Sequence, residues 1–476
     1  MKMRKHGWIA AGAVLMLLFH TSPGYPQSGN PEESLDAATL RNELRQLKEK
    51  VKELEDRLTE MEAAGAESSG VVQGTTPASG PEKQFAPAEK PEASSSPVSL
   101  DRKGLFVQSA DGDFQMKLRG YLQMDSRFYM DKDVSDDTFL LRRVRPILEG
   151  TVFDYYDYRI MPDFTGGSTT LFDAYLDVHY WPEARLRIGK FKPPVGLERL
   201  QSPLNISFPE LGLPTSLVPN RDIGIQLHGE VFDGALTYAV GIFNGVKDGG
   251  NGDLDDNDGK DFEARLFAHP FTGSEIDALK GLGFGLAGTY GGQEGALPAY
   301  KSIGQSQYFS YNKGAIADGS RSRISPQGYY YWGPFGLLGE YVLSSQEVAL
   351  NGLKEEFDND AWQIQATYVL TGENASYDGV KPKKPFSLKD GTWGALEVAA
   401  RYGQLEVDAD VFRQGFADLA QSAAKAEAME AGLNWYLNGN VQIKTSLAHI
   451  EYSGGGANGS DREDEDVIFT RFQIGF

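Results

Sequence analysis

Arginine and lysine recur at alternate positions between residues 114 and 191, so in an extended chain they would share one face. A guanidinium group offers a planar fork of donors that matches the oxygens of phosphate or carboxylate. The pattern therefore predicts an anion-binding surface. Its candidate residues are Lys117, Arg119, Arg127, Arg143, Arg145, Arg159, Arg185 and Arg187, with Lys192, Arg199 and Arg221 in the segment that follows.

Acidic residues occupy the same face of the same segments. Carboxylates on this face can pair with the arginines and reduce the net preference for anions. The sequence therefore predicts a mixed polar surface in which part of the basic charge is neutralised. The acids in this register are Asp125, Glu149, Asp157, Asp163, Asp173 and Asp177.

Three other patterns could carry chemistry, and each has a simpler interpretation. Gly283-x-Gly285-x-x-Gly288 matches the dinucleotide fingerprint, but it lies inside an alternating segment, so we interpret these glycines as small residues that leave space. Residues 249–263 resemble a calcium loop whose glycine falls one position late, which favours a solvated acidic loop with calcium as the alternative. The six histidines lack ligand spacing, and no nucleophile with a base is recognisable. We predict no metal, no cofactor and no enzymatic activity.

The elements that must position the basic face are β-strands. In FQMKLRGYLQMDSRFYM (114–130), apolar residues alternate with polar ones, with Lys117, Arg119 and Arg127 among the polar set. An arginine or lysine that faces lipid at the midplane of a membrane barrel costs about 2–4 kcal/mol, whereas a lumen-facing one stays hydrated. The basic face is therefore predicted to point into the lumen of a barrel.

Similar alternation continues to the end of the chain. We predict sixteen strands, an even number such as bacterial outer-membrane barrels have, joined by tight turns and long loops in alternation. A soluble sandwich or propeller is the alternative for an all-β chain. The predicted strands are 114–130, 139–153, 156–164, 171–181, 184–191, 222–232, 235–243, 261–270, 281–292, 323–333, 335–346, 360–371, 392–407, 423–437, 440–453 and 465–476.

The last segment, FTRFQIGF, favours the membrane barrel over a soluble fold. Phe472, Ile474 and Phe476 share one face of this segment. An aromatic residue at the end of a strand is typical of the aromatic girdle at a membrane interface. We therefore expect this strand to close on the first one, which leaves no free edge.

Bulk composition narrows the class of protein further. The chain has 476 residues, no cysteine and a formal net charge of −21. Such an acidic balance argues against nucleic acid as a partner, because phosphate binding needs a basic face. After the N-terminus no apolar run reaches the roughly 20 residues of a spanning helix.

The N-terminal part carries two further predictions. Residues 1–26 have a basic start and an apolar stretch, which predicts a signal peptide, with a membrane anchor as the alternative. Residues 36–62 show apolar residues at alternating spacings of four and three, with oppositely charged g and e positions, which predicts a parallel coiled coil, dimer or trimer. Residues 63–104, rich in Gly, Ser, Pro and Ala, are predicted to be a flexible linker to a barrel domain at 105–476.

Four runs resemble the phosphate-selective porin O and P family: LRRVRPILEGTVFDYYDYRIMPDF, LFDAYLDVHY, ARLRIGKFKPPVGLERLQSP and VPNRDIGIQLHGE. The resemblance implies a sixteen-stranded barrel, a trimer, and a third external loop, here residues 192–222, that folds into the pore. It also implies that Arg127, Arg142, Arg143 and Lys192 are the principal anion contacts. Strict alternation, however, places Arg142 on the outer face.

Together these features predict a trimeric porin in the outer membrane of a Gram-negative bacterium. We expect it to contact lipid and lipopolysaccharide, to hold its coiled coil in the periplasm, and to pass small hydrophilic solutes with a preference for anions such as phosphate. Rings of arginine and lysine are a known means of making a pore that favours anions. The alternatives are an envelope-anchoring structural barrel and a barrel closed by its own loops.

Overall fold

The computed structural model describes residues 97–101, 104–131, 135–253 and 257–476. The predicted signal peptide and coiled coil, and the predicted linker as far as residue 96, lie outside the described residues. Among the residues that are described, no helix is both long and apolar enough to cross a membrane.

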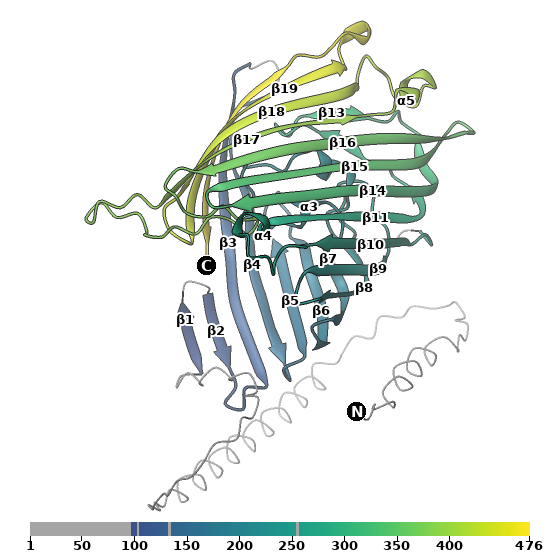
Figure 1. Ribbon diagram of the computed structural model, residues 1–476. Helices are drawn as coiled ribbons and strands as arrows, with labels where there is room; N and C mark the ends of the chain where they lie inside the picture. The colour runs from purple at the N-terminus through teal and green to yellow at the C-terminus, as the bar shows by residue number, and fades with distance from the viewer. Residues whose placement is uncertain (1–96, 102–103, 132–134, 254–256) are drawn as a thin grey trace, which may run out of the picture. The chain divides into compact units, whose positions relative to one another are not determined.

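Sixteen antiparallel strands close on themselves to form a barrel (Figure 1). The last wall strand pairs with the first, so that Phe469 lies opposite Arg127 and Gly475 opposite Tyr121. This closure pairs the two strands that would otherwise form the edges of the wall. The wall strands are β3 (Phe114–Tyr129), β4 (Thr138–Val152), β5 (Tyr156–Asp163), β6 (Thr170–Trp181), β7 (Ala184–Phe191), β8 (Asp222–Val231), β9 (Leu236–Phe243), β10 (Asp261–Ala268), β11 (Leu282–Gly295), β14 (Ile316–Trp332), β15 (Phe335–Leu350), β16 (Leu353–Val369), β17 (Ala395–Glu406), β18 (Ala423–Tyr436), β19 (Val441–Gly454) and β20 (Glu465–Gly475).

The wall strands confirm the predicted all-β barrel and its strand number. The largest differences in bounds are at β14 and β16, which begin seven residues before the predicted 323 and 360, and at β15, which ends four residues after the predicted 346. The added residues include Asp318, Glu347 and Glu356, which break the apolar alternation. These strand ends carry polar residues on their outer face. The alternation of apolar and polar residues that predicts a membrane strand therefore ends before the hydrogen-bonded ladder ends.

The two ends of the barrel differ in their connections. At one end, which we call the turn end, most connections are short, such as 182–183 and 333–334, and both β3 and β20 have their terminal ends there. Two longer connections also lie at this end: residues 269–281, with helix α4 (Asp277–Lys280), and residues 370–394. The opposite, loop end carries the longer connections, with helix α5 (Ala409–Arg413) and the 3₁₀ turn η2 (Ala457–Gly459).

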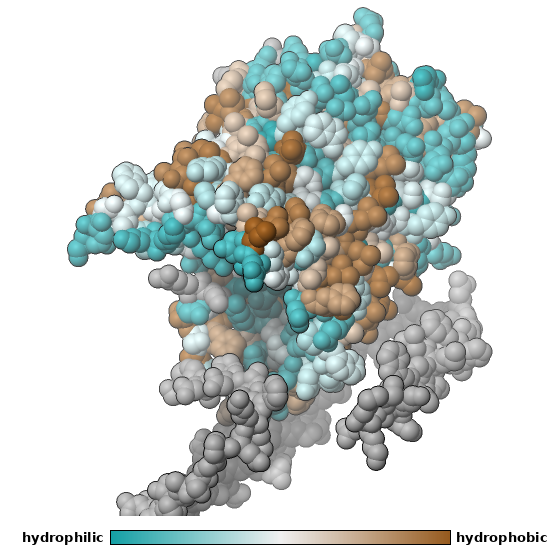
Figure 2. Space-filling view, in the orientation of Figure 1, coloured by the Kyte–Doolittle hydropathy of each residue, from teal (hydrophilic) through white to brown (hydrophobic). Residues whose placement is uncertain are grey.

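Apolar residues lie on the outer surface of the wall, and polar residues lie inside. Leu447 and Ile364 are about half exposed, whereas Lys444 and Arg471 are fully buried. Figure 2 shows apolar surface in a band between polar ends. This inside-out arrangement matches a wall whose outer face contacts acyl chains.

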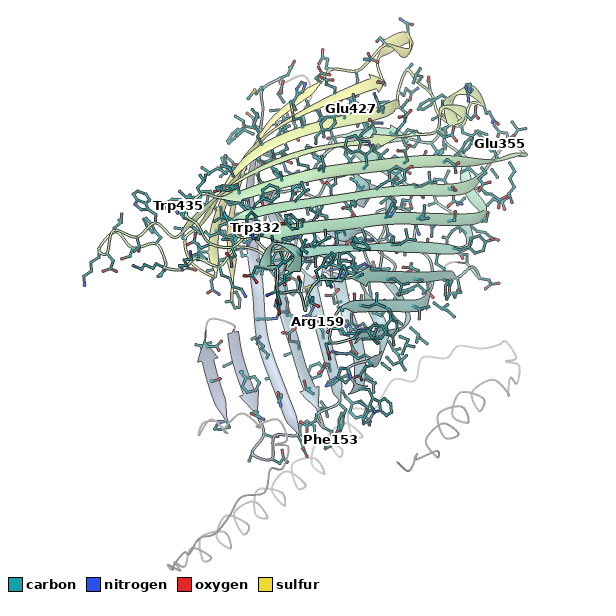
Figure 3. The ribbon with its side chains drawn as sticks, in the orientation of Figure 1. Phe153, Arg159, Trp332, Glu355, Glu427 and Trp435 are labelled. Atoms are coloured by element: carbon teal, nitrogen blue, oxygen red, sulfur yellow. The ribbon has the colours of Figure 1, made fainter. Side chains whose placement is uncertain are left out.

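Tryptophan marks one boundary of this band. Trp181, Trp332, Trp393 and Trp435 all lie at the turn end, and Figure 3 shows two of them at the opposite end of the strands from Glu355. Tryptophan is enriched at membrane–water interfaces, where its ring sits at headgroup level. The turn end of the wall therefore lies at one membrane interface.

Part of the lumen is filled by an apolar plug. Residues 296–315, which contain β12 (Ala299–Lys301) and β13 (Gln307–Ser310), fold inward at the loop end. Tyr300 and Phe309 are fully buried there, in one cluster with Val342 and Phe357 of the wall. Because this cluster includes wall residues of β15 to β20, open space is left mainly beside β3 to β10.

The connection between β7 and β8, residues 192–221, crosses the lumen as predicted for residues 192–222, and we call it the constriction loop. It contains helix α3 (Leu197–Leu200) and the 3₁₀ helix η1 (Leu213–Leu217), and η1 packs against β15, β16 and β17 on the far wall. Gly196 begins α3 at φ 80°, and a Cβ there would touch Val218. The Glu340 carboxylate accepts the backbone N–H of Leu197 at 2.5 Å, which ties α3 to the opposite wall.

A hairpin precedes the barrel and corrects one prediction. Strands β1 (Val98–Asp101) and β2 (Gly104–Gln108) pair with each other, and β2 pairs with β3 so that Leu105 lies opposite Leu118. Residues 98–101 fall within the predicted flexible linker, but this segment, with Val98 and Leu100 on one face, forms a strand. The ordered sheet therefore begins inside the predicted linker.

Candidate functional site: a cationic constriction

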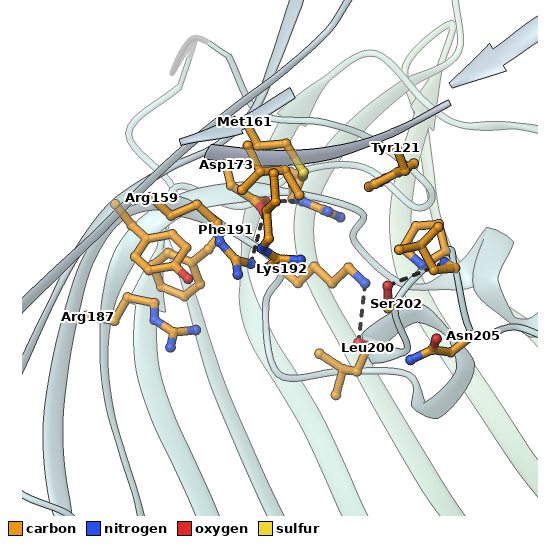
Figure 4. A pocket seen from close by; sticks show the side chains of 16 residues that line it. Tyr121, Arg159, Met161, Asp173, Arg187, Phe191, Lys192, Leu200, Ser202 and Asn205 are labelled. Atoms are coloured by element: carbon orange, nitrogen blue, oxygen red, sulfur yellow. Dashed lines mark hydrogen bonds and ion pairs between the residues drawn. The ribbon is translucent and has the colours of Figure 1, made fainter. Parts of the chain in front are cut away.

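Three cavities lie in series through the barrel. A cavity of about 510 Å³ lies toward the turn end (Figure 4), and one of about 410 Å³ lies toward the loop end. Between them is a cavity of about 110 Å³, which we call the central cavity. It shares Lys192 and Arg221 with the first and Arg142 and Arg199 with the second, so the three follow one another through the barrel. The central cavity is lined by Arg142, Arg143, Arg145, Phe172, Lys192, Arg199, Gln201, Pro203, Ile206, Leu211, Asn220 and Arg221.

A β-bulge in β4 places two successive arginines in the lumen. Opposite β4, Gln123 pairs with Arg143 and Met124 with Leu141, so Arg142 is the extra residue. The prediction that Arg142 lies on the outer face was therefore wrong, because strict alternation fails where a residue is inserted. Both Arg142 and Arg143 line the central cavity.

Glu210 of the constriction loop anchors three arginines of the wall. Arg142 donates to it from Nε at 2.6 Å and from Nη2 at 2.9 Å, and Arg127 donates from Nη2 at 3.0 Å. Arg471 lies 3.5 Å away and forms a bidentate pair with Asp125. Burial alone would raise the pKa of the Glu210 carboxyl, but the surrounding guanidinium groups, Arg142 foremost, hold this pKa well below its usual range.

The predicted inward acids all pair with basic residues. Asp163 accepts from Arg145 at 2.7 Å, and Asp173 from Arg221 at 2.6 Å. Glu149 is shared by Arg119 and Arg159, each at 2.6 Å. These pairs neutralise a large part of the basic face, as the mixed register indicated. The remaining pairs join Asp125 to Arg471, Asp157 to Arg185, and Asp177 to Arg185 and Arg187.

Three cations of the central cavity have no such partner. Within the described part of the chain, no carboxylate lies within 4 Å of a basic nitrogen of Arg143, Lys192 or Arg199. Arg143 is buried and donates to Gln123 Oε1 at 2.7 Å, and Lys192 donates to the Gln201 carbonyl at 2.7 Å. Like-charged groups gathered without a counter-charge are unfavourable, so this cavity favours an anion.

Lys192 and Arg199 reach the central cavity from the constriction loop. Arg199 is held by the Thr215 carbonyl at 2.6 Å, and its buried Nε has no hydrogen-bond partner among the described residues. Burial, with the charge of Arg221 next in size, holds the pKa of Lys192 well below its usual value. A bound anion would raise this pKa, because it supplies the counter-charge that the cavity lacks.

The other predicted basic residues lie along the turn-end part of the lumen. Arg119, Arg159 and Arg187 line the cavity of about 510 Å³ (Figure 4). Arg185 lines a neighbouring cavity of about 430 Å³. Lys117 lies farther toward the turn end, in a cavity of about 270 Å³ that Phe106 of β2 also lines. Six of the twelve predicted residues therefore line the central cavity. Five others line cavities toward the turn end of the barrel. Arg127, the twelfth, pairs with Glu210 beside the central cavity.

Sequence reasoning missed the residues that hold the constriction loop in place. Glu198 of α3 accepts from Arg401 of β17 at 3.0 Å and from the backbone N–H of Gly212 at 2.7 Å. Arg401 also donates to Glu430 at 2.5 Å. Alternation along β17 and β18 would have placed Arg401 and Glu430 in the lumen. For Glu198 and Glu210, which lie in a loop, no periodic signal exists.

Two of the three glycines of the fingerprint-like motif make room for aromatic rings. A Cβ on Gly283 would lie 2.7 Å from Phe267 and 2.8 Å from Tyr329, and one on Gly285 would lie 2.7 Å from Phe267. The interpretation that these glycines leave space is therefore confirmed for Gly283 and Gly285. Tyr329 in turn stacks on Tyr377 from the connection 370–394, with ring centroids 5.1 Å apart.

The described residues contain no group of three or more His, Cys, Asp or Glu side chains placed to hold a metal ion. Residues 254–256 of the acidic loop lie outside the described part.

Comparisons with known proteins were made for the sequence and for the fold. Residues 114–476 match the family model described as "Phosphate-selective porin O and P". Porin O of Pseudomonas aeruginosa is 26% identical over 427 residues, which covers 80% of this chain and 92% of that protein.

Two solved structures align with this chain. The outer membrane channel DcaP of Acinetobacter baumannii aligns with a TM-score of 0.50 at 12% identity, covering 78% of this chain and 99% of that one. The anion-selective porin from Comamonas acidovorans aligns with a TM-score of 0.48 at 11% identity, covering 76% of this chain and 100% of that one. At these identities the likeness to DcaP concerns the fold alone.

Proposed function

Because this chain belongs to the phosphate-selective porin O and P family and is an outer-membrane porin, we propose that it passes small hydrophilic solutes with a preference for anions such as phosphate. The observation that carries this proposal is the central cavity. Six basic side chains line it, and three of them, Arg143, Lys192 and Arg199, lack a carboxylate within 4 Å among the described residues.

Transport in this proposal is passive and depends on charge at short range. A solute entering from the loop end meets Lys301 and Lys247, then Arg142 and Arg199 at the central cavity. Beyond it lie the arginines of the turn-end cavity, which are neutralised by acids. Net positive charge is therefore concentrated at the smallest of the three cavities, so an anion gains most there.

The proposal predicts an anion-selective conductance. In planar bilayers under a KCl gradient, the reversal potential should lie on the chloride side of zero, and millimolar phosphate should reduce chloride current by competing for the central cavity. A reversal potential on the potassium side would contradict the anion preference while leaving the porin assignment intact. Absence of any conductance would favour a barrel closed by its own loops.

We further propose that the porin is a homotrimer with its coiled coil in the periplasm. The heptad pattern of residues 36–62 supports a parallel oligomer, and β3 begins at the turn end, which would be the periplasmic end. The outer band would contact lipid and, at the loop end, lipopolysaccharide.

This proposal predicts three copies per particle in detergent, measured as molar mass by light scattering with detergent correction. Deletion of residues 36–62 should leave the barrel trimeric but lower its resistance to dissociation on heating, because one of two contacts is removed. A molar mass of one chain for the full-length protein would contradict the proposal.

A further inference from the structure

The connection after β16, residues 370–394, passes from the lumen to the outer surface at the turn end. Its first part lies inside, where the Tyr377 hydroxyl donates to the carbonyl of Leu197 in the constriction loop at 2.6 Å. Val380 still packs beside the lumen-facing Tyr436. Beyond Val380 the chain crosses the rim of the barrel, and Figure 1 shows this connection projecting from the end of the strands.

The second part of the connection, residues 381–393, contacts the outer face through Phe386 and Trp393, and we call it the basic hairpin. Phe386 packs edge-on against Trp435, with ring centroids 5.1 Å apart. Trp435 faces outward, because its neighbours Asn434 and Tyr436 are 1% and 2% exposed inside the barrel. The hairpin therefore extends the outer wall beside the tryptophans that mark the membrane interface (Figure 3).

The basic hairpin is held in one conformation by its own hydrogen bonds. Ser387 and Thr392 exchange backbone hydrogen bonds at 2.9 and 3.1 Å. The Trp435 indole N–H donates to the Trp393 carbonyl at 2.7 Å, and the backbone N–H of Phe386 donates to Leu437 at 2.6 Å. The side chains on this hairpin are thus presented by a fixed backbone.

Those side chains combine positive charge with exposed apolar area. Lys381, Lys384 and Lys389 are exposed, and no carboxylate of the described residues lies within 4 Å of their ammonium groups. Leu388 is 85% exposed and Trp393 is 63% exposed. This concentration of free lysine occurs in a chain whose formal net charge is −21, so it runs against the overall composition.

From this arrangement we infer that the basic hairpin is a binding site for anionic phospholipids of the periplasmic leaflet. Leu388 and Trp393 enter the interface between headgroups and acyl chains, and the three lysines bind phosphate groups at the same depth. A lipid is favoured over a protein partner because the hairpin lies on the outer wall beside the outward-facing Trp435. The inference rests on the membrane orientation of the barrel and does not depend on the solute that passes through it.

The test measures lipid selectivity of the purified, full-length protein. The protein is equilibrated with equal amounts of dioleoylphosphatidylglycerol and dioleoylphosphatidylcholine in detergent, and the retained lipids are counted by native mass spectrometry. We expect the wild type to retain at least three times more of the anionic lipid. The triple variant Lys381→Gln, Lys384→Gln, Lys389→Gln should retain both lipids about equally, and arginine at the same three positions should restore the preference.

A matched variant removes the same charge elsewhere. Lys280→Gln, Lys313→Gln, Lys354→Gln alters three exposed lysines away from the basic hairpin and should keep the wild-type preference. Heat-dependent migration on gels confirms that each variant is folded. Equal lipid retention by the wild type and the hairpin variant would overturn the inference. A photocrosslinker at position 388 that captured a periplasmic protein instead of phospholipid in cells would also overturn it.

Discussion

Replacing Arg143 with alanine is expected to lower the ratio of anion to cation permeability about 3- to 10-fold. The reason is electrostatic: an anion about 6 Å from a unit positive charge, at an effective dielectric constant of about 40, is stabilised by about 1.4 kcal/mol. Arg143 is one of three cations in the central cavity without a carboxylate within 4 Å among the described residues. Its charge is therefore not already neutralised. Reversal potentials under a salt gradient give the ratio directly.

A control variant separates this local effect from a change in total charge. Lys354→Ala removes one positive charge from an exposed side chain at the loop end, 3.7 Å from both Asp318 and Glu347. At that distance from the passage, salt screens its charge, so selectivity should stay at the wild-type value. An unchanged ratio in the Arg143 variant would remove this residue from the set that selects anions.

The same site shows which parts of the structure the sequence could predict. Alternation placed Lys117, Arg119 and Arg127 in the lumen, because a basic residue facing lipid costs more than any local preference can offset. It failed at Arg142, where a bulge inserts one residue into the ladder. A bulge is fixed by pairing with a neighbouring strand, so one segment read alone carries no sign of it.

The ion pairs between residues distant in the chain also could not be predicted from the sequence. Which arginines keep a free charge depends on acids such as Glu210, which lies in a loop and reaches Arg127 and Arg142 only when that loop crosses the barrel. Periodicity identifies faces of strands, but it does not define the path of an irregular loop. The prediction of twelve basic candidates therefore could not separate the paired cations from Arg143, Lys192 and Arg199.

Replacing Glu210 with glutamine is expected to destabilise the folded barrel by about 3 to 5 kcal/mol, the usual cost of removing one partner from a buried ion pair. Arg127 and Arg142 would lose their carboxylate, and Arg471 would keep only Asp125 within the described residues. Unfolding in guanidinium chloride, followed by tryptophan fluorescence, measures the loss. Glu406→Gln is the control, because that exposed carboxylate lies opposite Asp360 and has no ion-pair partner among the described residues.

Acid should not reproduce the effect of this substitution in the physiological range. The pKa of Glu210 is held below its usual value by the arginines around it, against the opposing effect of burial, so the folded state binds its proton less readily than the unfolded state. The stability it contributes is therefore fully present above about pH 4.3, the unfolded pKa, and is lost only as the pH falls through the lower folded value. At pH 5 the wild type should therefore keep the anchor that Glu210 gives the constriction loop. The glutamine variant has lost this anchor to β3 and β4, so its channels should show larger and noisier openings at both pH values. A glutamine variant whose channels opened as quietly as those of the wild type at both pH values would contradict the anchoring role of Glu210.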